Sequence, residues 1–145
     1  KGIQKNPQNP DSAIEMLYDQ PIIMKKIFSF FKSIAASDIQ ILFRPRDIIF
    51  YATDHNEKTK IRIRINAEKI NGYYCCANLD VGISQKEMEM ILNKVDKNYR
   101  CIKLLSDIST ARMNLQIIFE TQNKCQDIQM GLYDNNNNYL EEIKQ

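Results

Sequence analysis

The sequence has little of what catalytic and cofactor-binding motifs require. It contains no tryptophan, four glycines and one histidine in 145 residues. The glycines, at positions 2, 72, 82 and 131, are too scattered to form a GxGxxG or GxxxxGK phosphate loop. A lone histidine excludes an HExxH zinc motif, and no DxD pair supplies carboxylates to a metal. We therefore expect no catalytic activity, no metal and no cofactor.

One alternative is that the protein is an enzyme whose motif is not recognised. His55 lies in the polar turn TDHNEK, between Asp54 and Glu57, and an unrecognised active site would lie there. No serine or cysteine has a plausible partner base, so a solvated surface histidine is the more typical interpretation.

Cysteine spacing and hydropathy bound the class of protein. The four cysteines, Cys75, Cys76, Cys101 and Cys125, include no CxxC pair with zinc spacing, which indicates reduced structural residues in an intracellular protein. No apolar run approaches the roughly 18–20 residues that span a membrane, and no signal peptide is visible. The chain begins at Lys1 rather than Met, so we expect a piece of a longer product.

The charge balance is only mildly basic. A net charge of +2 argues against the general basicity of a histone-like protein but permits a local basic patch. The hydrophobic and charged fractions, 43% and 26%, are those of a soluble globular domain.

Residues 21–36, PIIMKKIFSFFKSIAA, predict an amphipathic helix. Its apolar side comprises Ile23, Ile27, Phe30, Phe31 and Ile34, and its polar side Lys25, Lys26, Ser29, Lys32 and Ser33. Pro21 suits the first turn, where its missing N–H leaves no gap. The polar side carries three lysines and no acid. It is either an ordinary solvated surface or one that contacts phosphates.

The rest of the chain reads mostly as strands. They are predicted at 12–20, 38–43, 47–52, 60–66, 73–79, 100–107, 113–120 and 125–133. Gly82–Ser84 breaks the pattern, and Ser84 with Glu87 forms a capping box for a second helix over 85–97. Its predicted buried stripe is Met88, Ile91, Leu92 and Val95, opposite Lys86, Met90, Asn93 and Lys97.

The predicted element order is β-α-ββββ-α-βββ. This order predicts an α+β domain over residues 12–133, with two helices packed on one face of an antiparallel sheet. We expect residues 1–11 to be a flexible lead-in and residues 134–145 a polar linker.

Several segments together resemble the N-terminal domain of a PCNA-type sliding clamp, most closely the PCNA-like proteins of large cytoplasmic DNA viruses. They are Tyr18–Asp19 followed by PIIMKKIFSFFKSI, then NGYYCCANLDVGIS followed by EMEMILNKVD, then MNLQIIFE and CQDIQMGL. The resemblance covers about residues 12–132.

The resemblance implies a DNA polymerase processivity factor. Such a clamp is a ring, expected to be a homotrimer of the full-length chain, that encircles duplex DNA without reading its sequence and tethers polymerase and repair proteins through clamp-binding peptides. The DNA-facing candidates that it implies are Lys25, Lys26, Lys32, Lys86, Lys94 and Lys97. Met90 and Asn93 stand where the family has basic residues in mid-helix, so the second helix is expected to contribute less.

The resemblance also implies two protein contacts. The last strand, with Cys125, Asp127, Ile128, Met130 and Leu132, is expected to pair with the neighbouring subunit. Thr53, Ile61, Leu140 and Ile143 are expected to line the groove for partner peptides, and residues 134–145 to begin the linker to a second clamp domain.

Two functional alternatives remain open. One is the polymerase clamp, and the other is a clamp-like scaffold in repair, checkpoint or viral transcription without a polymerase partner. The resemblance to viral proteins implies a viral replication site in the host cytoplasm or nucleus, and we expect no membrane contact.

Overall fold

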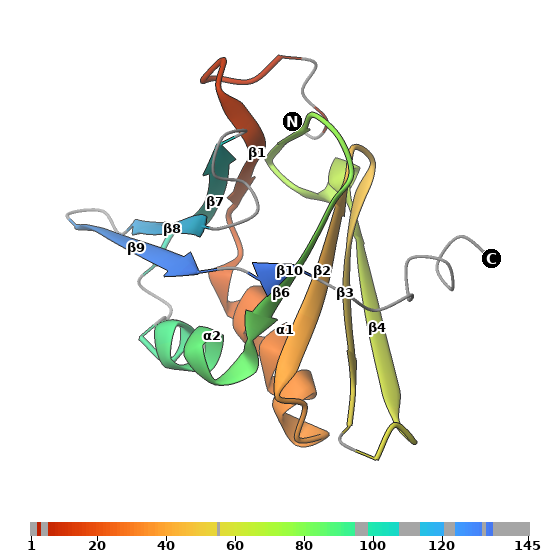
Figure 1. Cartoon of the computed structure of the whole chain (residues 1–145). Coiled ribbons are helices and arrows are strands. Elements are labelled where there is room, and N and C mark those ends of the chain that lie inside the picture. The colour runs from red at the N-terminus through yellow and green to blue at the C-terminus, as the bar shows by residue number, and fades with distance from the viewer. Residues whose placement is uncertain are drawn as a thin grey trace.

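The described part of the chain folds into an α+β structure with two α-helices. The computed structural model describes residues 3, 6–54, 56–94, 99–107, 114–120, 124–131 and 133–134. Within them the helices are α1 (Pro21–Ser33) and α2 (Gln85–Leu92), next to each other in Figure 1, and a 3-10 turn, η1, spans Ala67–Lys69. The strands are β1 (Ser12–Tyr18), β2 (Asp38–Arg44), β3 (Asp47–Thr53), β4 (Lys60–Asn66), β5 (Gly72–Cys75), β6 (Leu79–Ser84), β7 (Cys101–Asp107), β8 (Asn114–Glu120), β9 (Cys125–Gly131) and β10 (Tyr133–Asp134).

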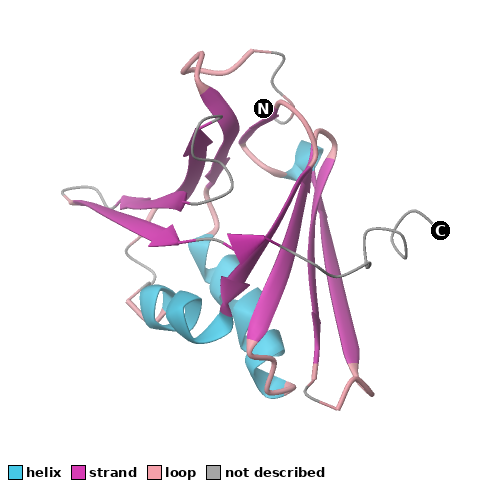
Figure 2. Ribbon diagram, in the orientation of Figure 1, coloured by secondary structure: helices cyan, strands magenta, loops and turns pink. Residues whose placement is uncertain are grey.

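The strands form two five-stranded sheets (Figure 2). Sheet A has the order β5-β1-β7-β8-β9, and sheet B the order β10-β6-β2-β3-β4. All pairings between these strands are antiparallel. The predicted class, with two helices on antiparallel strands, is confirmed, although the strands divide into two sheets.

The prediction of one strand over residues 73–79 is wrong. The chain bends at residues 76–78 and crosses from β5 in sheet A to β6 in sheet B, so five strands separate the helices instead of four. The Cys76 N–H donates to the Ala13 carbonyl and the Cys75 thiol to the Ala77 carbonyl, and these bonds hold the bend. Gly82 lies inside β6 and does not break it.

The buried side of helix α1 includes the predicted Ile27 and Phe31 but is rotated away from the predicted Ile23 and Phe30. Met24, Ile27, Phe28 and Phe31 are buried, whereas Ile23 and Phe30 are 38% and 60% exposed. The buried positions follow the spacing i, i+3, i+4 and i+7 of one helix face, and Ile23 and Phe30 fall on its flank.

Both helices end earlier than predicted. Helix α1 stops at Ser33, because Ala35 takes the left-handed conformation with φ 56° and the Ala36 N–H turns back to the Phe31 carbonyl. The Ser84 cap of α2 is confirmed, since its hydroxyl accepts from the Glu87 N–H at 3.2 Å. Helix α2 ends at Leu92, and the predicted Val95 and Lys97 lie outside the described residues.

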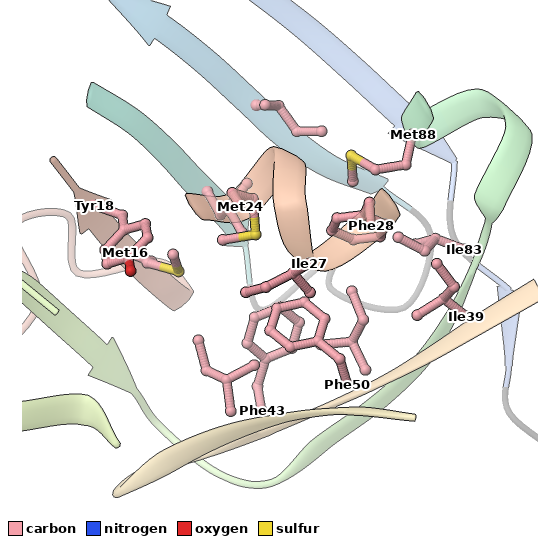
Figure 3. Close-up of a cluster of buried hydrophobic side chains, with 14 of the residues drawn as sticks. Met16, Tyr18, Met24, Ile27, Phe28, Ile39, Phe43, Phe50, Ile83 and Met88 are labelled. Atoms are coloured by element: carbon pink, nitrogen blue, oxygen red, sulfur yellow. The ribbon is translucent and has the colours of Figure 1, made fainter. Parts of the chain in front are cut away.

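The main core lies between α1 and the strands (Figure 3). Met16 and Tyr18 of β1, Phe43 and Phe50 of sheet B and Met88 of α2 surround α1 there. The rings of Phe28 and Phe50 meet edge to face with centroids 5.7 Å apart, which joins α1 to β3. This packing fixes which side of α1 faces solvent.

The segment before β1 also has contacts. Glu15 accepts from the Gln8 and Asn9 N–H groups at 2.8 and 2.9 Å, and Ile3 forms an isolated bridge to Tyr73. Burial raises the pKa of Glu15, and these hydrogen bonds lower it by more, so the net pKa is below the ordinary value. Flexibility of residues 1–11 stays a prediction.

Candidate nucleic-acid interface

The lysine surface of α1 consists of Lys25, Lys26 and Lys32. Because the core holds Met24, Phe28 and Phe31, the three lysines lie away from the most buried side of the helix. Lys25 and Lys32 are two helical turns apart and share one flank, whereas Lys26 is rotated by about 100° from Lys25. Lys26 and Lys32 are exposed and Lys25 is half-buried. The structure therefore brings together the three lysines that sequence analysis selected on this helix.

The predicted DNA-facing lysines of helix α2 do not share one side of the helix. Lys86 and Lys94 are both exposed, but Lys94 lines a pocket against β9 on the flank away from α1. Met90 and Asn93 are both exposed, Met90 beside the pocket against β9 and Asn93 on the flank that faces α1. Lys97 lies outside the described residues. Lys86 precedes Asn93 by two helical turns, so of the described α2 lysines it lies nearer the lysine surface.

An ion pair joins the two helices. Lys32 Nζ lies 2.8 Å from Glu89 Oε1. The pair borders a groove of about 60 Å³, the helix groove, lined by Lys25, Phe28, Ser29, Lys32, Gln85, Glu89, Leu92 and Asn93. The hydrogen bond from Lys32 holds the pKa of Glu89 below its ordinary value, so Glu89 is ionised at neutral pH. Sequence analysis missed this acid, because no local pattern reports which residue of one helix faces the other.

Strand β9 is the last strand of sheet A and leaves one edge without a partner strand among the described residues. Next to it lies a pocket of about 500 Å³, the edge pocket, lined by Glu87, Met90, Ile91, Lys94, Ile128, Gln129, Met130 and Gly131. Met90 is 62% exposed there. Cys125 and Asp127 are exposed on the other face of β9, and Leu132 lies outside the described residues. The predicted subunit contact therefore coincides with an open edge beside apolar surface.

The outer face of sheet B carries a second apolar cluster, the outer cluster, of Leu42, Ile49 and Tyr51. Ile49 and Tyr51 stand opposite Arg64 and Arg62, whose aliphatic stems can cover them. Sequence analysis missed the cluster, although a signal was present. Residues 39–43 and 48–52 are apolar at nearly every position, and such strands are covered on both faces.

The predicted partner groove divides between the two faces of sheet B. Thr53 follows Tyr51 by two residues and lies on the side of the outer cluster. Ile61 is paired with Ala52 and packs against the main core on the opposite face. Leu140 and Ile143 lie outside the described residues. The structure does not bring Thr53 and Ile61 together.

Gln40 adds a polar feature to the outer face. It stands opposite Tyr51, and its Oε1 atom is buried without a hydrogen-bond partner in the described structure. A buried acceptor of this kind loses its solvation without compensation, so a donor that reached it would bind favourably.

The enzyme alternative receives no support from the described residues around it. The Asp54 carboxylate accepts from the Lys58 and Thr59 N–H groups at 2.8 and 3.2 Å, which gives it a role in the turn. His55 lies outside the described residues. Within the described part of the chain, no group of three or more histidine, cysteine or acidic side chains is placed to hold a metal.

Two further observations concern the state of the cysteines and the length of the helices. All four cysteines are free thiols, and burial raises the pKa of Cys75 to about 11. Neither helix of the described chain has the length and apolarity that crossing a bilayer requires.

Comparison with known proteins identifies the domain. Residues 13–139 match the family model of the proliferating cell nuclear antigen (PCNA) N-terminal domain. The fold is similar to the crystal structure of PCNA from Thermococcus kodakaraensis, with a TM-score of 0.76 over 86% of this chain and 48% of that one. Sequence identity in that alignment is 10%, so it shows the shared fold alone.

The chain is also similar to an uncharacterized protein of African swine fever virus. The identity is 29% over 105 residues, for both the pig isolate from Kenya and the warthog isolate from Namibia. The alignment covers 72% of this chain and 35% of the viral protein, so the chain spans about a third of that relative.

Proposed function

Because this chain belongs to the PCNA family and carries its N-terminal domain, we propose that it is part of a DNA polymerase processivity factor. In this proposal the full-length protein is a sliding clamp, a ring that encircles duplex DNA and tethers replication and repair proteins to it. The PCNA family consists of clamps and not of enzymes, in line with the lack of catalytic motifs in the sequence.

The lysine surface is the observation that carries the proposal. It places three positive charges on a helix that has no acid of its own. Lysine ammonium groups attract phosphates without reading bases, so the protein stays mobile along the duplex. A sliding ring requires weak and screened contacts of this kind.

The β9 edge supports ring closure. Unpaired backbone groups on an edge strand accept a strand from another chain, and the apolar edge pocket gives that contact buried area. We propose that β9, with Cys125, Asp127, Ile128, Met130 and Leu132, pairs with the neighbouring subunit in a homotrimer of the full-length protein.

The outer face of sheet B supports a partner groove. The outer cluster, Thr53 and the unpartnered Gln40 oxygen combine apolar area with a buried acceptor. We propose that clamp-binding peptides of a polymerase or repair protein dock there, near the linker with Leu140 and Ile143. The African swine fever virus relatives support a viral replication site as the place of action.

Charge reversal of the lysine surface tests the proposal. The triple change Lys25→Glu, Lys26→Glu and Lys32→Glu is expected to abolish low-salt binding of a short mixed-sequence duplex, measured by fluorescence anisotropy. Lys58→Glu, Arg62→Glu and Lys69→Glu change the net charge by the same amount at exposed positions outside α1 and α2. Equal loss in both variants, or none in the first, would reject the assignment.

A further inference from the structure

Glu89 is an acidic residue beside a surface that is proposed to bind phosphates, and its negative charge opposes that binding. Its carboxylate lies beside the lysine surface and contacts Lys32 at 2.8 Å across the helix groove. The Lys32 side chain is 64% exposed and that of Glu89 28%, so the pair is open to solvent and to a ligand. Exposed ion pairs add little to folding stability, so fold stability alone does not account for the acid.

The rotation of the two helices explains how Glu89 reaches this site. Glu89 follows the buried Gln85 by one helical turn, so it is directed towards α1. Gln85 itself donates through Nε2 to the Phe28 carbonyl, which fixes α2 against α1 at that level. Glu87 lies on the other flank of α2 and lines the edge pocket. Glu89 therefore acts on the lysine surface from a fixed position.

We infer that Glu89 is an internal phosphate mimic that limits the DNA affinity of the lysine surface by competing with phosphate for Lys32. This inference rests on the proposed function and names a regulating residue within the same site. When a phosphate approaches, Lys32 exchanges one anionic partner for another, and the carboxylate left behind repels the DNA. Each effect lowers affinity without lowering the number of lysines.

The consequence for function is a weaker and more mobile contact. A surface that binds many phosphates tightly slows movement along DNA, because each released contact must re-form in the next register. A paired Lys32 makes this exchange nearly neutral in energy. The pair thus favours sliding over tight binding.

Neutralisation of Glu89 tests the inference. Glu89→Gln keeps the size of the side chain and one acceptor oxygen and removes its charge. It is expected to tighten low-salt binding of a short mixed-sequence duplex, and to steepen the decline of log K with log salt by about 0.9, as for one more phosphate contact. Between 50 and 200 mM salt this slope corresponds to a roughly 3.5-fold larger loss of affinity.

Two controls separate competition from net charge. Glu68→Gln removes the same charge at an exposed position away from both α-helices and is expected to leave the salt slope unchanged. In a Lys32→Met background, Glu89→Gln is expected to change the slope by less, because only the repulsion between Glu89 and DNA remains. Equal slopes for Glu89→Gln and Glu68→Gln, or an undiminished effect without Lys32, would overturn the inference.

The two proposals fail in different ways. If the unmodified chain binds duplex through the lysine surface but Glu89→Gln leaves the slope unchanged, the competition is rejected and the clamp function stands. If the unmodified chain does not bind duplex in low salt, both are rejected together.

Discussion

The Nε atom of Arg64 donates to Oδ2 of Asp47 across 2.6 Å, so strand β4 is tied to the beginning of β3 by a charged hydrogen bond. Only 3% of the Asp47 side chain is exposed. Arg44 completes the site with two 2.6 Å bonds, from Nε and from its terminal nitrogen. Two arginines thus compensate one buried carboxylate at the β2–β3 turn.

Loss of the Arg64 contact is expected to weaken the fold modestly. Arg64→Met keeps the aliphatic stem over Ile49 and removes one of two cations from a buried carboxylate. We expect a loss of about 1 kcal/mol in the free energy of unfolding, because Arg64 is itself largely exposed and Arg44 remains. Chemical denaturation measures it. Arg62→Met, on the same strand and face, is expected to change stability by less than about 0.5 kcal/mol, and similar losses in both variants would contradict the assignment.

The same carboxylate makes stability depend on pH. Burial raises the pKa of Asp47, but the bonds from Arg44 and Arg64 lower it by more, so its folded-state pKa lies below the ordinary value of about 3.9. A depressed pKa gives stabilisation that is complete above the unfolded-state pKa and is lost as the pH falls through the folded-state pKa.

The free energy of unfolding is therefore expected to fall on acidification below about pH 4. Asp47→Asn is expected to weaken this dependence of the unfolding free energy on pH. Denaturation at a series of pH values measures it. Asp11→Asn removes an exposed carboxyl and serves as the control. If Asp47→Asn loses as much unfolding free energy below about pH 4 as the unmodified protein, other carboxylates dominate the acid dependence.

Adjacent phenylalanines of α1 are expected to differ sharply in their contribution. Phe31 is fully buried and Phe30 is 60% exposed. Phe31→Ala leaves a cavity and is expected to cost about 3–5 kcal/mol of unfolding free energy. Phe30→Ala is expected to cost less than about 1 kcal/mol. Thermal or chemical denaturation measures the loss of unfolding free energy in each variant. Comparable losses would mean that Phe30 is covered in solution.

That pair also shows how far periodicity predicts structure. The pattern of residues 21–36 correctly predicted a helix on which Lys26 and Lys32 are exposed, whereas Lys25 is half-buried. It could not rank Phe30 below Phe28 for burial, because an apolar side chain exposed on a helix flank has the same local signature as a buried one. Packing against Phe50 and the strands beneath α1, which are distant in sequence, determines that Phe28 is buried.

Contacts between distant segments set the other limits. The bend at residues 76–78 contains neither glycine nor proline, and it is held by bonds to Ala13 and Ala77. The pairing of Lys32 with Glu89 joins residues 57 positions apart. By contrast, the Ser84 cap is local, and sequence analysis predicted it correctly.

The edge pocket provides the last prediction. In the proposed ring, β9 and α2 of one subunit meet its neighbour, so a charge placed on this apolar surface has to be buried on assembly at a cost of several kcal/mol. Met90 is 62% exposed, so Met90→Glu is expected to leave the isolated fold intact and to shift the full-length product from trimer to monomer. Light scattering on a sizing column measures the mass.

A matched change separates this contact from general hydrophobic association. Leu17 is 37% exposed on sheet A, away from α2, and Leu17→Glu adds the same charge there. It is expected to leave the trimer intact, because β1 is flanked by β5 and β7 and offers no free edge. Trimers that survive Met90→Glu, or that are lost equally with Leu17→Glu, would move the subunit contact away from β9, because an interface closed through this edge has to bury the added carboxylate beside Ile91, Ile128 and Met130.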